Sequence, residues 1–146
     1  MNPDIKTITL GKEEVAALLP QKSPFVMVDK MFSFSETGIH TGLKIGTENI
    51  LSGEHFFSEA GLIEHMAQSV ALHTGYQFFL RNEAAPVGYI GSIKEIEINA
   101  LPKLNEEIET TVTILQEFMG ITLVDISTKL NNIEIAKGQM KTVLAK

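Results

Sequence analysis

The second half of the chain alternates apolar and polar residues with the period of two that half-buried β-strands show. In the clearest case Ile108, Thr110, Val112 and Ile114 share one face, and charged or threonine side chains occupy the other. Four segments of this kind are predicted as strands, separated by turn residues at 118–120 and 131–132: 87–98, 106–117, 121–130 and 133–144. Short turns between long strands predict an antiparallel meander.

Residues 59–80 follow a different pattern, with apolar side chains around much of the circumference of a helix. Ser58 is an expected N-cap, and Glu59 suits the positive end of the helix dipole. A helix of this length spans roughly 30 Å, enough to cross a small domain. Small residues recur every four positions along it and predict close approach to a sheet: Ala67, Ala71 and Gly75.

Before this helix the pattern predicts a short helix over 11–19 that Pro20 ends, followed by strands over 25–34 and 39–45. The order is one helix, two strands, a long helix and four strands. Among α+β arrangements, this order is best satisfied by a curved antiparallel sheet wrapped around one central helix. We expect residues 1–146 to form a single domain, because this length suits one core.

Composition removes several classes of function. A formal net charge of −6 argues against a nucleic-acid-binding protein. The absence of cysteine excludes disulfides and thiol chemistry and agrees with a cytoplasmic location. The most apolar stretch, 62–80, is interrupted by charged and amide side chains, so no membrane span is expected, and the N-terminus lacks the pattern of a signal peptide.

Glu64 is the first candidate functional residue, because a carboxylate in so apolar a helix is costly unless it has partners or a task. Gln68 lies one turn further along and can hydrogen-bond it. His55 stands in the loop before the helix, whereas His65 and His73 are expected in or beside the core. The histidines lack metal-ligand spacing, so no metal is expected.

Three segments resemble the FabZ-like 3-hydroxyacyl-(acyl carrier protein) dehydratases, which have a hot-dog fold. Residues 18–29 read Leu-Leu-Pro-Gln-Lys-Ser-Pro-Phe-Val-Met-Val-Asp and resemble the family's entry motif, with Gln21 where the family carries histidine. Residues 64–68, Glu-His-Met-Ala-Gln, resemble its helix motif, and residues 88–94 resemble a later strand. His55 precedes Glu64 by only nine positions, and this spacing is shorter than the family's. In this shortened form the chain is more similar to the dehydratase-like proteins of aryl-polyene and flexirubin pigment clusters.

The resemblance implies dehydration of a 3-hydroxyacyl thioester to the trans-2-enoyl thioester, without a cofactor. It implies Glu64 as the acid and His55 as the base, acting across the interface of two protomers. Gln68 would hold Glu64, and backbone donors at the helix start would polarise the thioester carbonyl. The further residues implied in substrate binding are Ala60 and Gly61 at that helix start, and Pro24, Phe25, Tyr89 and Gly91.

Two alternatives remain open. Hot-dog thioesterases also use a helix carboxylate, and a non-catalytic acyl-binding subunit could support a catalytic hot-dog partner. The expected partners are an acyl carrier protein or a coenzyme A thioester, and a second hot-dog subunit in a homodimer or heterodimer. An acidic carrier protein would dock on lysines such as Lys94 or Lys103.

Overall fold

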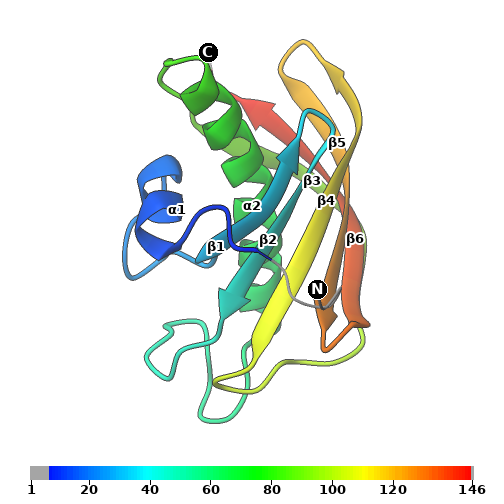
Figure 1. The fold of residues 1–146 in the computed structure, drawn as a ribbon. Coiled ribbons are helices and arrows are strands. Elements are labelled where there is room, and N and C mark those ends of the chain that lie inside the picture. The colour runs from blue at the N-terminus through cyan, green and yellow to red at the C-terminus, as the bar shows by residue number, and fades with distance from the viewer. Residues whose placement is uncertain (1–6, 146) are drawn as a thin grey trace.

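The computed structural model describes residues 7–145, which form two helices and a six-stranded antiparallel sheet (Figure 1). The strands are paired in the order β1-β2-β4-β5-β6-β3. The elements in chain order are α1 (Lys12–Leu18), β1 (Lys30–Ser35), β2 (Gly38–Lys44), α2 (Glu59–Leu80), β3 (Gly88–Ile98), β4 (Glu107–Phe118), β5 (Ile121–Leu130) and β6 (Ile133–Leu144).

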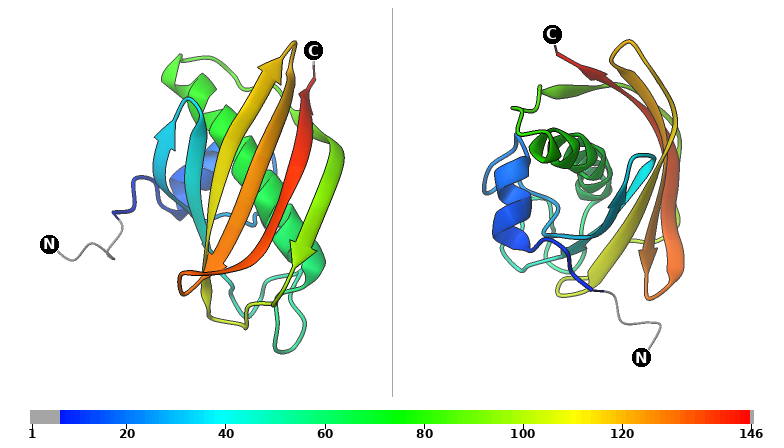
Figure 2. Two further views of the ribbon diagram at one scale, coloured as in Figure 1. Left: turned by 90° about the vertical axis from the view of Figure 1, so that its right-hand side faces the viewer. Right: turned by 45° about the horizontal axis from the view of Figure 1, so that its top comes forward.

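The sheet curves around α2, and α1 lies on the opposite side of that helix from the sheet (Figure 2). The alternation of apolar and polar residues correctly predicts the inner face, since Ile108, Thr110 and Val112 are all buried. Leu62, Met66 and Leu72 of α2 are fully buried in the same core. The predicted α+β arrangement, a curved sheet around one central helix, is therefore confirmed.

The long helix has the predicted bounds, Glu59–Leu80. The Ser58 hydroxyl accepts a hydrogen bond from the Gly61 backbone N–H at 3.0 Å, which satisfies one of the four unpaired donors of the first turn. Local side-chain chemistry thus defines where α2 begins.

The stripe of small residues does not pack closely against the sheet, as the sequence predicted that it would. A Cβ at Gly75 would collide with the Leu18 carbonyl oxygen at the end of α1. The close approach is therefore to α1 and not to the sheet. Because α2 is apolar on most sides, its pattern does not show which neighbour each side faces.

The strand predicted over 25–34 is wrong for residues 25–29, because β1 begins only at Lys30. Side chains of α2 take the place of a neighbouring strand here. The Met27 N–H donates to Gln68 Oε1 at 2.6 Å, and the Phe25 carbonyl accepts from Gln68 Nε2 at 2.8 Å. The Met27 N–H and the Phe25 carbonyl are thus satisfied by a side chain and not by a neighbouring strand.

The predicted meander is correct for β4, β5 and β6 but wrong for β3, which pairs with β6 at the edge of the sheet. The connection from β3 to β4 crosses the open end of the sheet. Its backbone bonds to several segments, with Asn99 N–H donating to the Ile135 carbonyl at 2.7 Å and Asn105 N–H to the Ile45 carbonyl at 2.7 Å. Alternation identifies a strand but not its neighbour.

A buried polar chain joins α2 to the sheet through His65. Its Nδ1 lies 2.7 Å from the Met27 carbonyl oxygen, which can only accept, so Nδ1 carries the proton. Its Nε2 therefore accepts from the Thr110 hydroxyl, also at 2.7 Å. Thr110 is bonded in turn to Thr128 at 2.6 Å. The neutral imidazole fits this arrangement, and burial lowers the pKa of His65 from 6.5 to about 4.

The burial of neutral His65 predicts that the fold is less stable in acid. Between pH 6.5 and about 4 the unfolded chain binds a proton that the folded chain does not, so the free energy of unfolding falls as the pH is lowered. The loss approaches ~3 kcal/mol and stops growing below the folded pKa, where both states are protonated. Burial lowers the pKa of His73 as well, with the same sign. Denaturant unfolding across this range should show a smaller loss in His65→Gln than in the wild type, and equal losses would contradict the assignment.

Candidate active site

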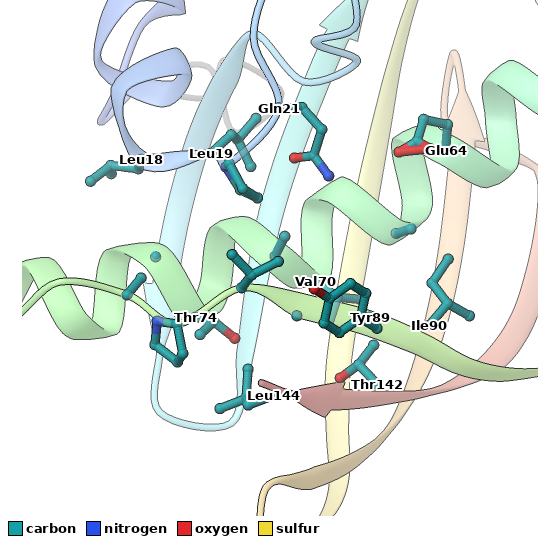
Figure 3. Close-up of a pocket in the computed structure, with 18 of the residues that line it drawn as sticks. Leu18, Leu19, Gln21, Glu64, Val70, Thr74, Tyr89, Ile90, Thr142 and Leu144 are labelled. Carbon is teal, nitrogen blue, oxygen red and sulfur yellow. The ribbon is translucent and has the colours of Figure 1, made fainter. Parts of the chain in front are cut away.

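A pocket of about 420 Å³ lies between α1, α2 and β3, and Glu64 stands on its wall (Figure 3). The side of α2 that faces it carries Ala67, Ala71 and Gly75, which explains the small-residue stripe. Because small side chains leave space that large ones would fill, the stripe creates the cavity as well as the contact with α1. Most of the remaining wall is apolar, formed by Ala17, Leu18, Leu19, Val70, Ala85, Pro86, Val87, Ile90 and Leu144.

Glu64 is half-buried, and its carboxylate is held in place by Gln68. Gln68 Nε2 donates to Glu64 Oε2 at 3.0 Å and also to the Phe25 carbonyl, while its Oε1 accepts from Met27 N–H. The fully buried amide is thus engaged at both ends. This arrangement confirms the predicted contact between Gln68 and Glu64, and fixes one carboxylate oxygen beside the pocket.

Of the remaining predicted substrate-binding residues, Tyr89 alone lines the pocket together with Glu64. Pro24, Phe25, Ala60, Gly61 and Gly91 are not among its lining residues. Phe25 is 60% exposed, with its backbone oxygen bonded to Gln68. The Gly61 N–H is already bonded to Ser58, so it is not a free donor for a thioester carbonyl.

His55 does not share a cavity with Glu64 within one protomer. It is exposed and lines a separate surface hollow together with Phe56, Lys103 and Leu104. Lys103, one of the two predicted docking lysines, therefore lies beside His55, and Lys94 is exposed on β3. His55 and Glu64 of the same chain therefore line different cavities.

Sequence reasoning missed the part of the wall that comes from α1, from the segment 85–87 and from β6. Gln21 belongs to this missed set, although its place in the entry motif is a signal that could have identified it. Thr142 and Leu144 of β6 line the pocket because β3 pairs with β6. That pairing could not be read from the sequence.

The pocket adjoins a second, smaller cavity of about 100 Å³ between α2 and the sheet. The two cavities share four wall residues: Val70, Thr74, Thr142 and Leu144. The smaller one is more polar, since His73, Arg81 and Glu117 border it. A chain that enters beside Glu64 could therefore extend past Val70 toward the far half of α2.

No group of three or more potential metal ligands occurs among residues 7–145. Within the same described part of the chain, neither helix is long and apolar enough to cross a membrane. What the site offers chemically is one anchored carboxylate in the wall of a mostly apolar pocket, the environment of a general acid or base acting on an apolar substrate.

Comparison with solved structures identifies the fold. The fold is the hot-dog fold, shared with the dehydratase heterocomplex ApeI:P from Xenorhabdus doucetiae, to which the structure is similar with a TM-score of 0.79 and 16% sequence identity over 90% of this chain and 91% of that one. A hypothetical thioesterase with coenzyme A from Streptococcus pneumoniae is also similar, with a TM-score of 0.62 and 9% identity over 79% of this chain and 84% of that one.

At the sequence level, the chain is 24% identical to the 3-hydroxyacyl-[acyl-carrier-protein] dehydratase FabZ of Vibrio cholerae over 139 residues, covering 91% of this chain and 90% of that protein. The profile of the ApeP-like family, described as ApeP dehydratase, matches residues 13–145. The chain therefore belongs to the ApeP-like dehydratases, and the FabZ-like resemblance drawn from its motifs is confirmed.

Proposed function

We propose that this protein removes water from a 3-hydroxyacyl thioester carried by an acyl carrier protein and forms the trans-2-enoyl thioester. The observation that carries the proposal is the carboxylate of Glu64, held by Gln68 at the wall of an apolar pocket of about 420 Å³. Membership of a dehydratase family and the similarity to FabZ support the reaction class and the carrier.

Glu64 acts as the acid in this scheme. A base removes a proton from C2 of the acyl chain, and the electron pair of that C–H bond forms the C2=C3 double bond. The C3–O bond breaks as protonated Glu64 gives its proton to the departing oxygen, which leaves as water. The proton that the base took from C2 is then transferred to Glu64, which restores the starting protonation of both groups.

We propose that the base comes from a second subunit. In one protomer His55 and Glu64 line separate cavities, so the two would meet only across an interface. The unpaired edge of β3 suits such an interface because it exposes Tyr89, Ile90 and Ile93. The same stretch of chain, from 85 to 90, lines the Glu64 pocket, so a subunit on this edge would also enclose the substrate.

One buried core includes Val15 of α1, Met31 of β1 and Met140 of β6. This shared core supports our proposal that residues 1–146 act as one domain. Carrier docking is proposed on the side of Lys103, because that lysine borders the hollow that contains His55.

The reaction itself is tested by incubating the protein with 3-hydroxyacyl and trans-2-enoyl thioesters. Interconversion of the two, followed by the absorbance of the enoyl thioester, is the expected result. Release of free thiol without interconversion would replace the dehydratase with a thioesterase, the alternative that the Streptococcus pneumoniae structure suggests. Neither signal from the chain alone, with activity restored by a second hot-dog subunit, would indicate the heterodimeric arrangement.

His55→Ala decides where the base resides. If a second copy of this chain supplies it, we expect turnover by the homodimer to fall by roughly 10²–10⁴-fold. The free energy of unfolding should change by less than about 0.5 kcal/mol, because His55 is exposed. Full activity in His55→Ala would remove this residue from the mechanism and assign the base to another subunit. Sedimentation that shows only monomers of the active protein would contradict a two-subunit site.

A further inference from the structure

Gln21 occupies a place in the pocket to which the proposed mechanism assigns no role. It follows Pro20 at the end of α1 and lines the pocket together with Glu64. The Gln21 side chain extends into the pocket with its amide nitrogen on the side of Glu64 (Figure 3). The Glu64 carboxylate points toward Gln21. Two hydrogen-bonding groups from distant parts of the chain therefore line the same cavity, whose wall is mostly apolar.

The amide of Gln21 is not satisfied by the protein. Its Oε1 is buried and has no hydrogen-bond partner among the described residues. Native proteins leave few buried polar atoms in this condition, because an unpaired buried acceptor is costly.

Gln68 shows the contrast within the same site. Its two amide atoms bond to Met27, Phe25 and Glu64, which accounts for its presence as a structural residue. No comparable contact accounts for Gln21. No hydrogen bond within the described residues engages the Gln21 amide nitrogen either, and this nitrogen, the end of the amide on the side of Glu64, is therefore available to a ligand (Figure 3).

We propose that the Gln21 side-chain N–H binds the 3-hydroxyl oxygen of the substrate and holds it for protonation by Glu64. This inference rests on the proposed dehydratase function. The hydroxyl oxygen has two lone pairs, of which one accepts the Glu64 proton as the C3–O bond breaks and the other accepts the Gln21 N–H. Gln21 transfers no proton and stabilises the negative charge that develops on the leaving oxygen.

This role makes Gln21 a specificity determinant. A saturated acyl thioester lacks the hydroxyl and leaves the Gln21 amide unpaired, so the pocket discriminates against it. Without Gln21 the rest of the wall offers mostly apolar contacts, which saturated and hydroxylated chains make equally well. Gln21 thus distinguishes the substrate from the fully reduced acyl chain.

The test measures dissociation constants in a Glu64→Gln background, so that no substrate is consumed. The probes are 3-hydroxybutanoyl, 3-hydroxyhexanoyl and 3-hydroxyoctanoyl coenzyme A, each paired with its saturated counterpart. The parent should prefer the hydroxylated member roughly tenfold, and Gln21→Leu should abolish that preference. Gln21→Glu keeps the size but has no N–H donor, so it should also lose the preference.

Thr142→Val is the matched control, because it removes a polar group from the same pocket on β6 and should leave the preference unchanged. The thermal stability of Gln21→Leu should not fall, since the replaced oxygen has no partner. If that variant does not fold, the same question is tested by changing the ligand and keeping the pocket unmodified, with 3-fluoroacyl thioesters as the probes. Fluorine is close to hydroxyl in size but a far weaker acceptor, so these thioesters should bind like the saturated ones.

Two results would overturn the assignment. Unchanged preference in Gln21→Leu would remove Gln21 from hydroxyl recognition, and a preference kept in Gln21→Glu would assign recognition to the oxygen and not to the N–H donor. Preference for the hydroxyl together with no water loss by the wild type would refute the dehydratase proposal and leave only the recognition of the hydroxyl by Gln21. Failure to bind any thioester would refute both.

Discussion

Glu64→Gln is expected to lower the rate of dehydration by roughly 10²–10⁴-fold, the range that a positioned general acid contributes. Glutamine has the size of glutamate and can still accept the hydrogen bond from Gln68 that lies at 3.0 Å in the wild type. The pocket therefore keeps its shape, and the dissociation constant for the thioester should stay nearly unchanged. Steady-state hydration of a trans-2-enoyl thioester, measured beside thioester binding, gives both quantities.

Glu59→Gln is the matched control, since it removes a carboxylate from the same helix at an exposed position outside the pocket. It should leave turnover unchanged, and it should change the free energy of unfolding by no more than about 1 kcal/mol through the helix dipole. Activity retained by Glu64→Gln would refute the acid role. Equal losses of turnover in Glu64→Gln and Glu59→Gln would indicate a general effect on the helix.

Gln68→Leu is expected to affect both stability and catalysis. It removes the acceptor for the buried Met27 N–H and the donor for the Phe25 carbonyl and Glu64. A buried donor left unpaired costs about 1–3 kcal/mol, so we expect the free energy of unfolding to fall by about 2–4 kcal/mol in total. Turnover should fall as well, because the Glu64 carboxylate loses the group that holds it. Denaturant unfolding and the hydration assay measure the two effects.

Gln77→Leu provides the comparison, because Gln77 lies on the same helix but does not hold residues 25–27. Its effect on stability should be within about 0.5 kcal/mol. If Gln68→Leu were no less stable than Gln77→Leu, the amide bonds between α2 and residues 25–27 would not contribute to the fold as the distances indicate.

The sequence by itself determined the elements and the inner faces of most of them. The bounds of α2 were predictable because Ser58 caps its first turn, a contact within a few residues of sequence. The buried face of β4 was predictable because alternation along a strand reflects which side meets the core. Glu64 was identifiable because a carboxylate in an apolar helix is costly to bury. The motif shared with FabZ-like dehydratases then indicated a function for it.

Only the tertiary structure decided which segments became neighbours. The pairing of β3 with β6 brings Thr142 and Leu144 to the pocket, and nothing in the pattern of either strand specifies its partner. Residues 25–27 read as a strand, yet the Met27 N–H donates to the side chain of Gln68, 41 residues away. The separation of His55 from Glu64 and the unpaired oxygen of Gln21 likewise depend on contacts between segments far apart in the chain. Local patterns report how strongly a residue prefers burial, whereas the identity of its neighbour depends on how the whole chain packs.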